Sequence, residues 1–144
     1  MGHLLVLLQF GLLLLLAAAA GPSIASGGLT SPAWALAAAS LVLAVWTLAH
    51  NRLGNFNIRP EPKDGGQLIT SGPYHWIRHP MYTSVLLGAT ALAWIAPSWA
   101  WLAWAALWGV LWTKATLEER QMTAHHPGYA AYRQRSRRFL PWLL

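Results

Sequence analysis

Residues Gly72 to Tyr82 read GPYHWIRHPMY and lie where a polar segment meets a long apolar one. Proline restricts the residue before it to extended conformations and is well tolerated in the first turn of a helix. We therefore expect His79 to lie outside a helix that begins at Pro80. The first turn of that helix has backbone N–H groups without helical partners and a partial positive charge. Together with Arg78 and His79 this turn predicts an anion site, suited to the carboxylate of a small charged ligand.

The apolar segment that follows is too long to be one membrane span. No charged side chain occurs from residue 79 to residue 113. A straight helix of that length would be about 52 Å long, against a hydrocarbon core of about 30 Å. The segment must therefore fold back on itself, and Pro97-Ser98 is the expected turn, which predicts spans near 81–96 and 98–113.

The N-terminal third is also apolar, since no charged side chain occurs before Arg52. A connection rich in Gly, Pro and Ser at residues 21–32 divides it and predicts spans near 4–20 and 33–49. Residues 12–23 resemble the apolar core and small-residue exit of a signal peptide. A basic region before that core is missing, so we expect the first span to be retained.

Composition and charge indicate a membrane protein. Hydrophobic residues make up 56% of the 144 residues and charged ones 10%, which is too apolar for an ordinary soluble domain. All ten Lys and Arg residues lie in 52–78 or 114–138, so both basic segments and both termini are expected on the cytoplasmic side of the cell (inner) membrane. The net charge of +6 then favours contact with membrane lipids over nucleic acid. The chain has no cysteine, which excludes disulfides, thiolate catalysis and cysteine metal sites.

An ordered set of motifs runs from the polar loop to the C-terminus. Its members are Gly72, Tyr74, Arg78-His79-Pro80, Tyr82, Glu118-Glu119, Tyr129, Tyr132, Arg138 and Pro141. This set resembles the isoprenylcysteine carboxyl methyltransferase and phospholipid N-methyltransferase superfamily over roughly residues 52–142. Members of that superfamily are integral membrane enzymes that use S-adenosyl-L-methionine. With the four predicted spans, the resemblance implies an all-α integral membrane fold in one domain, residues 1–144. Its cytoplasmic loop and C-terminal interfacial segment would form the cofactor site.

The resemblance and the residue chemistry together assign the cofactor contacts to two polar segments. The assigned residues are Gly66, Gln67, Leu68, Ile69, Tyr74, Arg78, His79, Pro80, Met81, Tyr82, Glu118 and Glu119. The cationic residues suit the cofactor carboxylate, and the glutamates suit its ammonium group or ribose hydroxyls. Aromatic and apolar side chains suit the adenine and the sulfonium. Taken alone, the two glutamates would also fit an ordinary solvated helix end.

Lys114 is the expected acceptor-side residue. It lies four residues before Glu118, and a pair between them would leave Glu119 freer for ligand. The resemblance places a substrate-side arginine at Lys114. Lysine keeps the positive charge but lacks the planar guanidinium that can bind a carboxylate through two hydrogen bonds. Glu119 is the candidate catalytic residue, as a proton acceptor for an amine, whereas a carboxylate or thiolate acceptor needs none.

The acceptor itself is left open between a prenylcysteine carboxylate, a phospholipid amine and a small lipophilic thiol. The short chain favours a small acceptor pocket or one completed by a second subunit, which would make the protein a homo-oligomer. A non-catalytic membrane scaffold is an alternative. A four-span transporter of lipophilic cations is another, but it would need an intramembrane carboxylate, and the predicted spans contain no Asp or Glu.

The last predicted span is rich in tryptophan and is expected to continue out of the bilayer to about His125. Trp101, Trp104, Trp108 and Trp112 fall on one helical face. They would form either the wall of a channel for a lipophilic substrate or a surface for helix packing and lipid contact, and the second reading is favoured. No metal site is expected, because His125-His126 reads as a solvated turn. The segment after residue 128 is expected to fold back at the interface as a lid.

Overall fold

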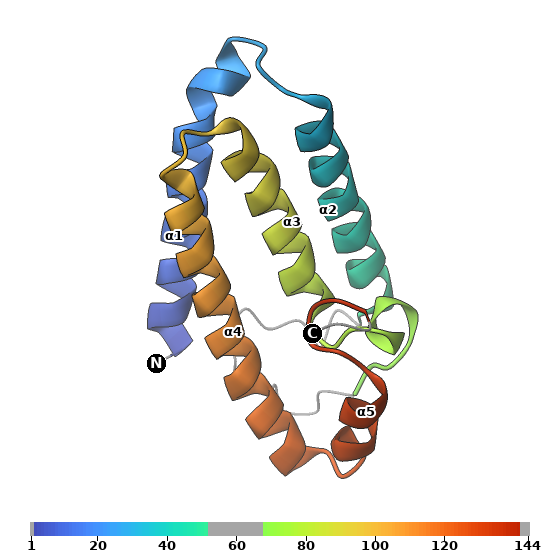
Figure 1. Cartoon of the computed structure of the whole chain (residues 1–144). Helices are drawn as coiled ribbons and strands as arrows, with labels where there is room; N and C mark the ends of the chain where they lie inside the picture. Colours follow the sequence, from blue (N-terminus) through green and yellow to red (C-terminus); the bar gives the residue numbers. More distant parts are fainter. Residues whose placement is uncertain (1, 52–67, 142–144) are drawn as a thin grey trace.

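The computed structural model describes residues 2–51 and 68–141. In these ranges the helices are α1 (Gly2–Ala25), α2 (Ser31–His50), α3 (Pro80–Ile95), α4 (Ala100–His125) and α5 (Tyr129–Arg135), with a 3-10 turn, η2 (Gly72–His75), before α3. Figure 1 shows α1 to α4 side by side, with α5 and the C-terminal segment at the end of the bundle where α2 ends and α3 begins. The all-helical prediction is confirmed for the described residues.

Two predicted helix boundaries are confirmed, and one connection differs. Helix α3 begins at Pro80, and His79 caps it with a non-helical φ of −123°. Helix α4 ends at His125, as expected. The first connection is shorter than predicted, because α1 continues past Pro22 to Ala25. Pro22 removes one backbone hydrogen bond and crowds the carbonyl of Ala18, yet the helix continues for three residues beyond it, and the Ser26 N–H still donates to the Pro22 carbonyl at 3.1 Å.

The core lies between α1, α3 and α4. Its buried members are Leu16, Leu86, Ala89, Ala93, Ala100, Ala103, Leu107 and Leu111. Many are alanines, which let the helix axes approach closely. Helix α2 packs on the outer side of α3, where Ser40 Oγ donates a hydrogen bond of 2.7 Å to the Ser84 carbonyl. A Cβ atom added at Gly88 would lie 3.0 Å from Ser40 Oγ. The small residues of α3 therefore allow α2 to approach closely.

Helices α1 and α2 are long and apolar enough to cross a membrane by length and composition, and α3 is a shorter apolar helix. Only 22% of the most apolar window of α1 and 11% of that of α2 are buried. Large apolar side chains point outward instead, among them Leu7, Leu14, Leu41, Val42 and Val45. A core helix of a soluble protein would bury such residues, whereas lipid accommodates them.

Candidate functional site

The candidate site forms at one end of the bundle, where three segments meet. Helix α3 begins there, α4 extends beyond the bundle, and residues 136–141 return from α5 across the start of α3. We refer to residues 136–141 as the C-terminal strap. The segment after residue 128 does fold back onto the bundle, and its role as an interfacial lid stays a prediction.

Backbone hydrogen bonds fix the strap to the segment before α3. The Arg78 N–H donates to the Arg137 carbonyl at 2.7 Å, and the His79 N–H donates to the Arg138 carbonyl at 3.1 Å. In return, the Arg137 N–H donates to the Trp76 carbonyl at 2.9 Å. This short parallel pairing places the side chains of Arg78, His79 and Arg138 at a common point.

A buried aromatic residue closes the strap over the site. Phe139 is 1% exposed, and its ring lies 5.5 Å from that of Trp108 and 5.9 Å from those of Trp112 and His79, between centroids. Its carbonyl accepts a hydrogen bond of 2.7 Å from Thr83 Oγ1. The strap therefore shields the start of α3 from water.

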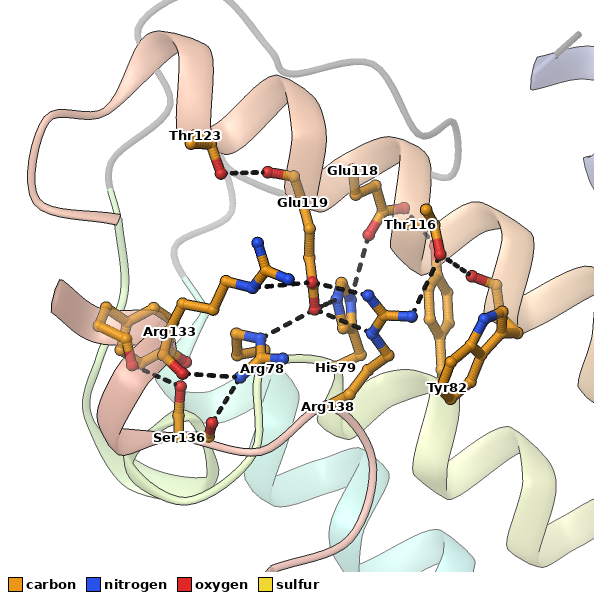
Figure 2. A network of polar contacts seen from close by, with 12 residues as sticks. Arg78, His79, Tyr82, Thr116, Glu118, Glu119, Thr123, Arg133, Ser136 and Arg138 are labelled. Carbon is orange, nitrogen blue, oxygen red and sulfur yellow. Dashed lines mark hydrogen bonds and ion pairs between the residues drawn. The ribbon is translucent and has the colours of Figure 1, made fainter. Parts of the chain in front are cut away.

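Glu119 lies at the centre of the site, between cationic side chains from three segments (Figure 2). It is 3% exposed, and its carboxylate oxygens lie 2.8 Å from Arg78 Nε and 2.8 Å from an Arg138 terminal nitrogen. His79 Nε2 is 3.2 Å from Oε1, and Arg133 Nε is 3.7 Å from Oε2. The expectation that Glu119 is the freer glutamate is therefore wrong. The anion beside Arg78 and His79 is the carboxylate of Glu119 itself.

The electrostatics of the centre follow from this geometry. Burial favours the neutral form of Glu119, but hydrogen bonds from His79, Arg138 and Arg78 outweigh it and hold the pKa well below the ordinary value. Burial also opposes the charge of His79, and hydrogen bonds to Glu118 and Glu119 outweigh it and raise the pKa of this imidazole. Because both ring nitrogens face carboxylates, the imidazolium can donate to each of them.

Glu118 is the more accessible carboxylate, with 23% of its side chain exposed. It accepts a short hydrogen bond from the Tyr82 hydroxyl, and its other oxygen is 3.3 Å from His79 Nδ1. The Tyr82 ring stacks on the His79 ring at a centroid distance of 5.4 Å. Burial and the charge of Glu118 raise the pKa of Tyr74 to about 12. Glu118 therefore presents a charged oxygen pair at the edge of a largely buried cluster.

Lys114 lies one helical turn before Glu118 and is 1% exposed. Its ammonium donates a hydrogen bond of 2.7 Å to Gln9 Oε1 of α1 and lies 5.1 Å from the centre of the Tyr82 ring. The charge of Glu118 also acts on it. The hydrogen bond to α1 was not anticipated, because the sequence suggests a partner only within α4.

The structure brings together six of the twelve residues that the sequence assigned to the cofactor. Those that share the cluster are Tyr74, Arg78, His79, Tyr82, Glu118 and Glu119. Pro80 is buried at the start of α3, Met81 follows it in the first turn, and Leu68 and Ile69 are half-buried. Gly66 and Gln67 lie outside the described residues. The roles of all these residues toward a ligand remain predictions.

The sequence did not assign a site role to Gln9 or to any individual residue after α4, although the C-terminal segment as a whole was expected to form part of the cofactor site. Arg138 belongs to the motif set, yet its contact with Glu119 was not expected. Arg78 also reaches the carbonyls of Arg133 and Ser136. The spacing of Tyr129, Tyr132 and Ser136 could have indicated that one face of this segment packs inward. These three residues are buried in α5 and the strap, whereas the residues between them are exposed. Among the described residues, no group of three or more His, Asp or Glu could hold a metal ion.

The four tryptophans of α4 make a continuous line of ring contacts. Successive centroids lie 5.8, 5.9 and 6.3 Å apart from Trp101 to Trp112. Trp104 Nε1 donates a hydrogen bond of 2.9 Å to Thr90 Oγ1 of α3, which supports the reading as a packing surface. At the site end the Arg138 guanidinium lies 4.4 Å from the Trp112 ring centre.

Comparison with known proteins finds a match to the model of one family. The model described as phospholipid methyltransferase matches residues 32–129. The cobalt-zinc-cadmium resistance protein CzcN of Cupriavidus metallidurans is 38% identical over 78 residues, which are 53% of this chain and 36% of CzcN. The matched stretch thus spans about a third of that curated relative's length. No solved structure matches the chain.

Proposed function

The chain belongs to the phospholipid methyltransferase family, and from this we propose that it transfers a methyl group from S-adenosyl-L-methionine to a lipophilic acceptor reached from the bilayer. The observation that carries the proposal is the cluster of Glu118, His79 and Tyr82, which places an accessible carboxylate beside a dry aromatic surface. Such a combination suits a ligand that is charged at one end and methylates a nucleophile away from water.

The donor set fits the proposed cofactor. The ammonium group or the ribose hydroxyls of the cofactor need a hydrogen-bond acceptor, and the partly exposed carboxylate of Glu118 would supply one. Its carboxylate needs cationic donors. Arg78, Arg133 and Arg138 surround Glu119, so the cations outnumber the two carboxylates of the cluster. Arg133 is 55% exposed and lies 3.7 Å from Glu119, which leaves it able to turn toward a ligand.

S-adenosyl-L-methionine, when bound, supplies a methyl group on a positively charged sulfur. The chain's own residues would bind and orient this molecule and exclude water from it. Glu118 holds the polar end, and Phe139 with Trp108 keeps the region beside His79 dry. Glu119, the residue expected to act as a base, fits a positioning role better. A carboxylate whose pKa is held low by three cationic neighbours is a poor proton acceptor, and it orients Arg78, His79 and Arg138 instead.

The decisive measurement is calorimetric titration of the detergent-purified protein with S-adenosylhomocysteine. We expect the parent protein to bind S-adenosylhomocysteine. In Glu118→Gln the affinity should fall about tenfold or more, because a hydrogen bond to a charged group contributes about 1.5–3 kcal/mol. Arg120→Gln on the exposed side of α4 serves as the control and should bind as the parent does. Absence of binding to the parent protein would refute the proposal. Transfer of labelled methyl groups to a lipid extract would then separate an enzyme from a non-catalytic scaffold.

The same proposal places α1 to α4 across the cell membrane with both termini in the cytoplasm. Because the chain has no cysteine, single cysteines can be introduced as labels. Those at Ser26 and Ser98, which lie in the two charge-free turns, should react with an impermeant maleimide from outside intact cells. One at the exposed Gln134 should react only after the membrane is opened. Labelling of Gln134→Cys from outside would overturn this orientation.

A further inference from the structure

The last turn of α2 packs against η2, outside the cluster that forms the candidate site. The His50 ring lies directly beside the backbone of Gly72. A Cβ atom added to Gly72 would be 2.8 Å from His50 Nδ1 and nearer still to the ring carbons Cγ and Cδ2. The same Nδ1 donates a hydrogen bond of 3.0 Å to the Trp46 carbonyl, and the Trp46 ring lies 5.8 Å from the Trp76 ring, between centroids. Two side chains of α2 therefore contact the turn that precedes α3.

Glycine is required at position 72 for two separate reasons. Its φ of +58° lies in the left-handed region, which glycine adopts readily and other residues rarely adopt. In addition, the His50 ring occupies the space that a Cβ atom would need. A larger residue at this position would have to move the His50 ring, the turn, or both.

The turn η2 and the residues after it form a compact unit that carries part of the site. The Pro73 carbonyl accepts hydrogen bonds of 3.2 and 3.1 Å from the backbone N–H groups of Trp76 and Ile77. Pro73 and Ile77 are buried, so the unit has little room to deform. Because Arg78 and His79 follow Ile77 directly in the chain, a displacement of the turn would move both of them.

The C-terminal segment holds the same turn from the side away from α2, and Figure 1 shows the light-green turn between the end of α2 and α5. The Tyr132 hydroxyl of α5 donates a hydrogen bond of 2.6 Å to the Tyr74 carbonyl. The Arg137 N–H of the strap donates one of 2.9 Å to the Trp76 carbonyl. The position of the turn therefore depends on α2 as well as on the strap.

We propose that His50 and Gly72 are positioning residues of the site, because the contact between them fixes how far the turn lies from α2. Both residues act through Arg78 and His79, which the turn carries. Helix α2, of whose most apolar window only 11% is buried, is thereby a support of the site as well as an apolar helix that faces outward. The inference rests on the proposed function for its ligand-binding test, and a second test needs no ligand.

The site tolerates little displacement of this turn. One ring nitrogen of His79 lies 3.3 Å from Glu118 and the other 3.2 Å from Glu119. Arg78 Nε lies 2.8 Å from the Glu119 carboxylate. Since hydrogen bonds are lost beyond about 3.5 Å, a shift of the turn by about 1 Å would break the contacts of His79 with both carboxylates.

The first test is a double-mutant cycle on the contact, measured by calorimetric titration of the detergent-purified protein with S-adenosylhomocysteine. Gly72→Ala should bind about tenfold more weakly than the parent, because the added methyl group overlaps with the His50 ring. The double variant Gly72→Ala/His50→Ala lacks this overlap, and its affinity should return to within about threefold of that of His50→Ala alone. A double variant that binds no better than Gly72→Ala would overturn the inference.

Gly109→Ala is the matched control for the first test. Gly109 is an exposed glycine of α4, and a Cβ atom added there meets nothing within 4 Å. Its affinity for S-adenosylhomocysteine should stay within about twofold of the parent value, because the substitution moves no neighbouring group. An equal loss of affinity in Gly109→Ala would mean that the effect at position 72 is not specific to its contact with His50, and would refute the positioning role.

The second test follows the His79 imidazole by NMR in histidine-labelled protein without any ligand. Hydrogen bonds to Glu118 and Glu119 raise the pKa of His79 against the opposing effect of burial. In Gly72→Ala these bonds lengthen, so the pKa of His79 should fall, and it should recover in the double variant. If Gly72→Ala does not fold, His50→Ala should show a smaller fall of the same sign. An unchanged His79 titration in the folded variants would overturn the inference, whereas failure of the parent protein to bind S-adenosylhomocysteine would count against the proposed function alone.

Discussion

Replacing Glu119 by glutamine should destabilise the protein by about 3–5 kcal/mol at neutral pH, the range found when one partner of a buried ion pair is removed. Glutamine keeps the volume of the side chain but removes the charge. Arg78, His79 and Arg138 would then face one another without the carboxylate that lies 2.8 Å from each arginine. Thermal unfolding of the purified protein in detergent should show a large fall in the transition temperature, and affinity for S-adenosylhomocysteine should fall with it.

Glu118→Gln is the matched control, because Glu118 is adjacent in sequence and more exposed. It should weaken cofactor binding with a much smaller effect on unfolding. The pH dependence gives a second check. A carboxylate whose folded pKa is depressed stabilises the fold above its unfolded pKa, and this contribution is lost as the pH falls through the folded value. The stability gap between parent and Glu119→Gln should thus persist from neutral pH down to about the ordinary glutamate value of 4.5 and shrink below it. A gap that is already absent at pH 7 would contradict the central role of Glu119.

Replacing Phe139 by alanine should cost about 3–5 kcal/mol, as for other buried aromatic residues. The ring is 1% exposed and fills the space between Trp108, Trp112 and His79. Its loss leaves a cavity and loosens the strap, so Arg138 is no longer held beside Glu119. We expect a lower unfolding temperature and weaker binding of S-adenosylhomocysteine.

Leu140→Ala provides the control in the next position of the strap. Leu140 is 40% exposed, so its truncation should change unfolding and binding little. Phe139→Leu should recover part of both losses because it refills much of the space. If Phe139→Ala unfolds at the parent temperature and binds as tightly, the strap does not support the site.

The sequence was sufficient to predict the elements that local rules decide. Pro80 determines where α3 begins, because the residue before a proline avoids the helical region. The length of the charge-free run predicts the hairpin of α3 and α4, since one straight helix would exceed the bilayer. The glutamate pair and Arg78-His79 could be assigned to one site because both lie at the same end of the two helices that the hairpin joins.

The sequence could not predict which residues would meet across long separations. Arg138 reaches Glu119, and Gln9 reaches Lys114 from another helix 105 residues away along the chain. Neither contact follows from the spacing of residues along one helix, and each depends on how the helices are rotated about their axes. From the four-residue spacing alone, the sequence predicts a partner for Lys114 within its own helix and a freer carboxylate at Glu119.

The pairing of the strap with the segment before α3 also bears on biogenesis. Arg137 and Arg138 bond to backbone atoms of Trp76, Arg78 and His79, which are synthesised about sixty residues earlier. The strap follows every helix of the chain, so its residues are the last of the site to be synthesised. The contacts of Arg138 and Phe139 with α3 and α4 can therefore form only after translation has passed the strap, so the geometry around Glu119 is completed late.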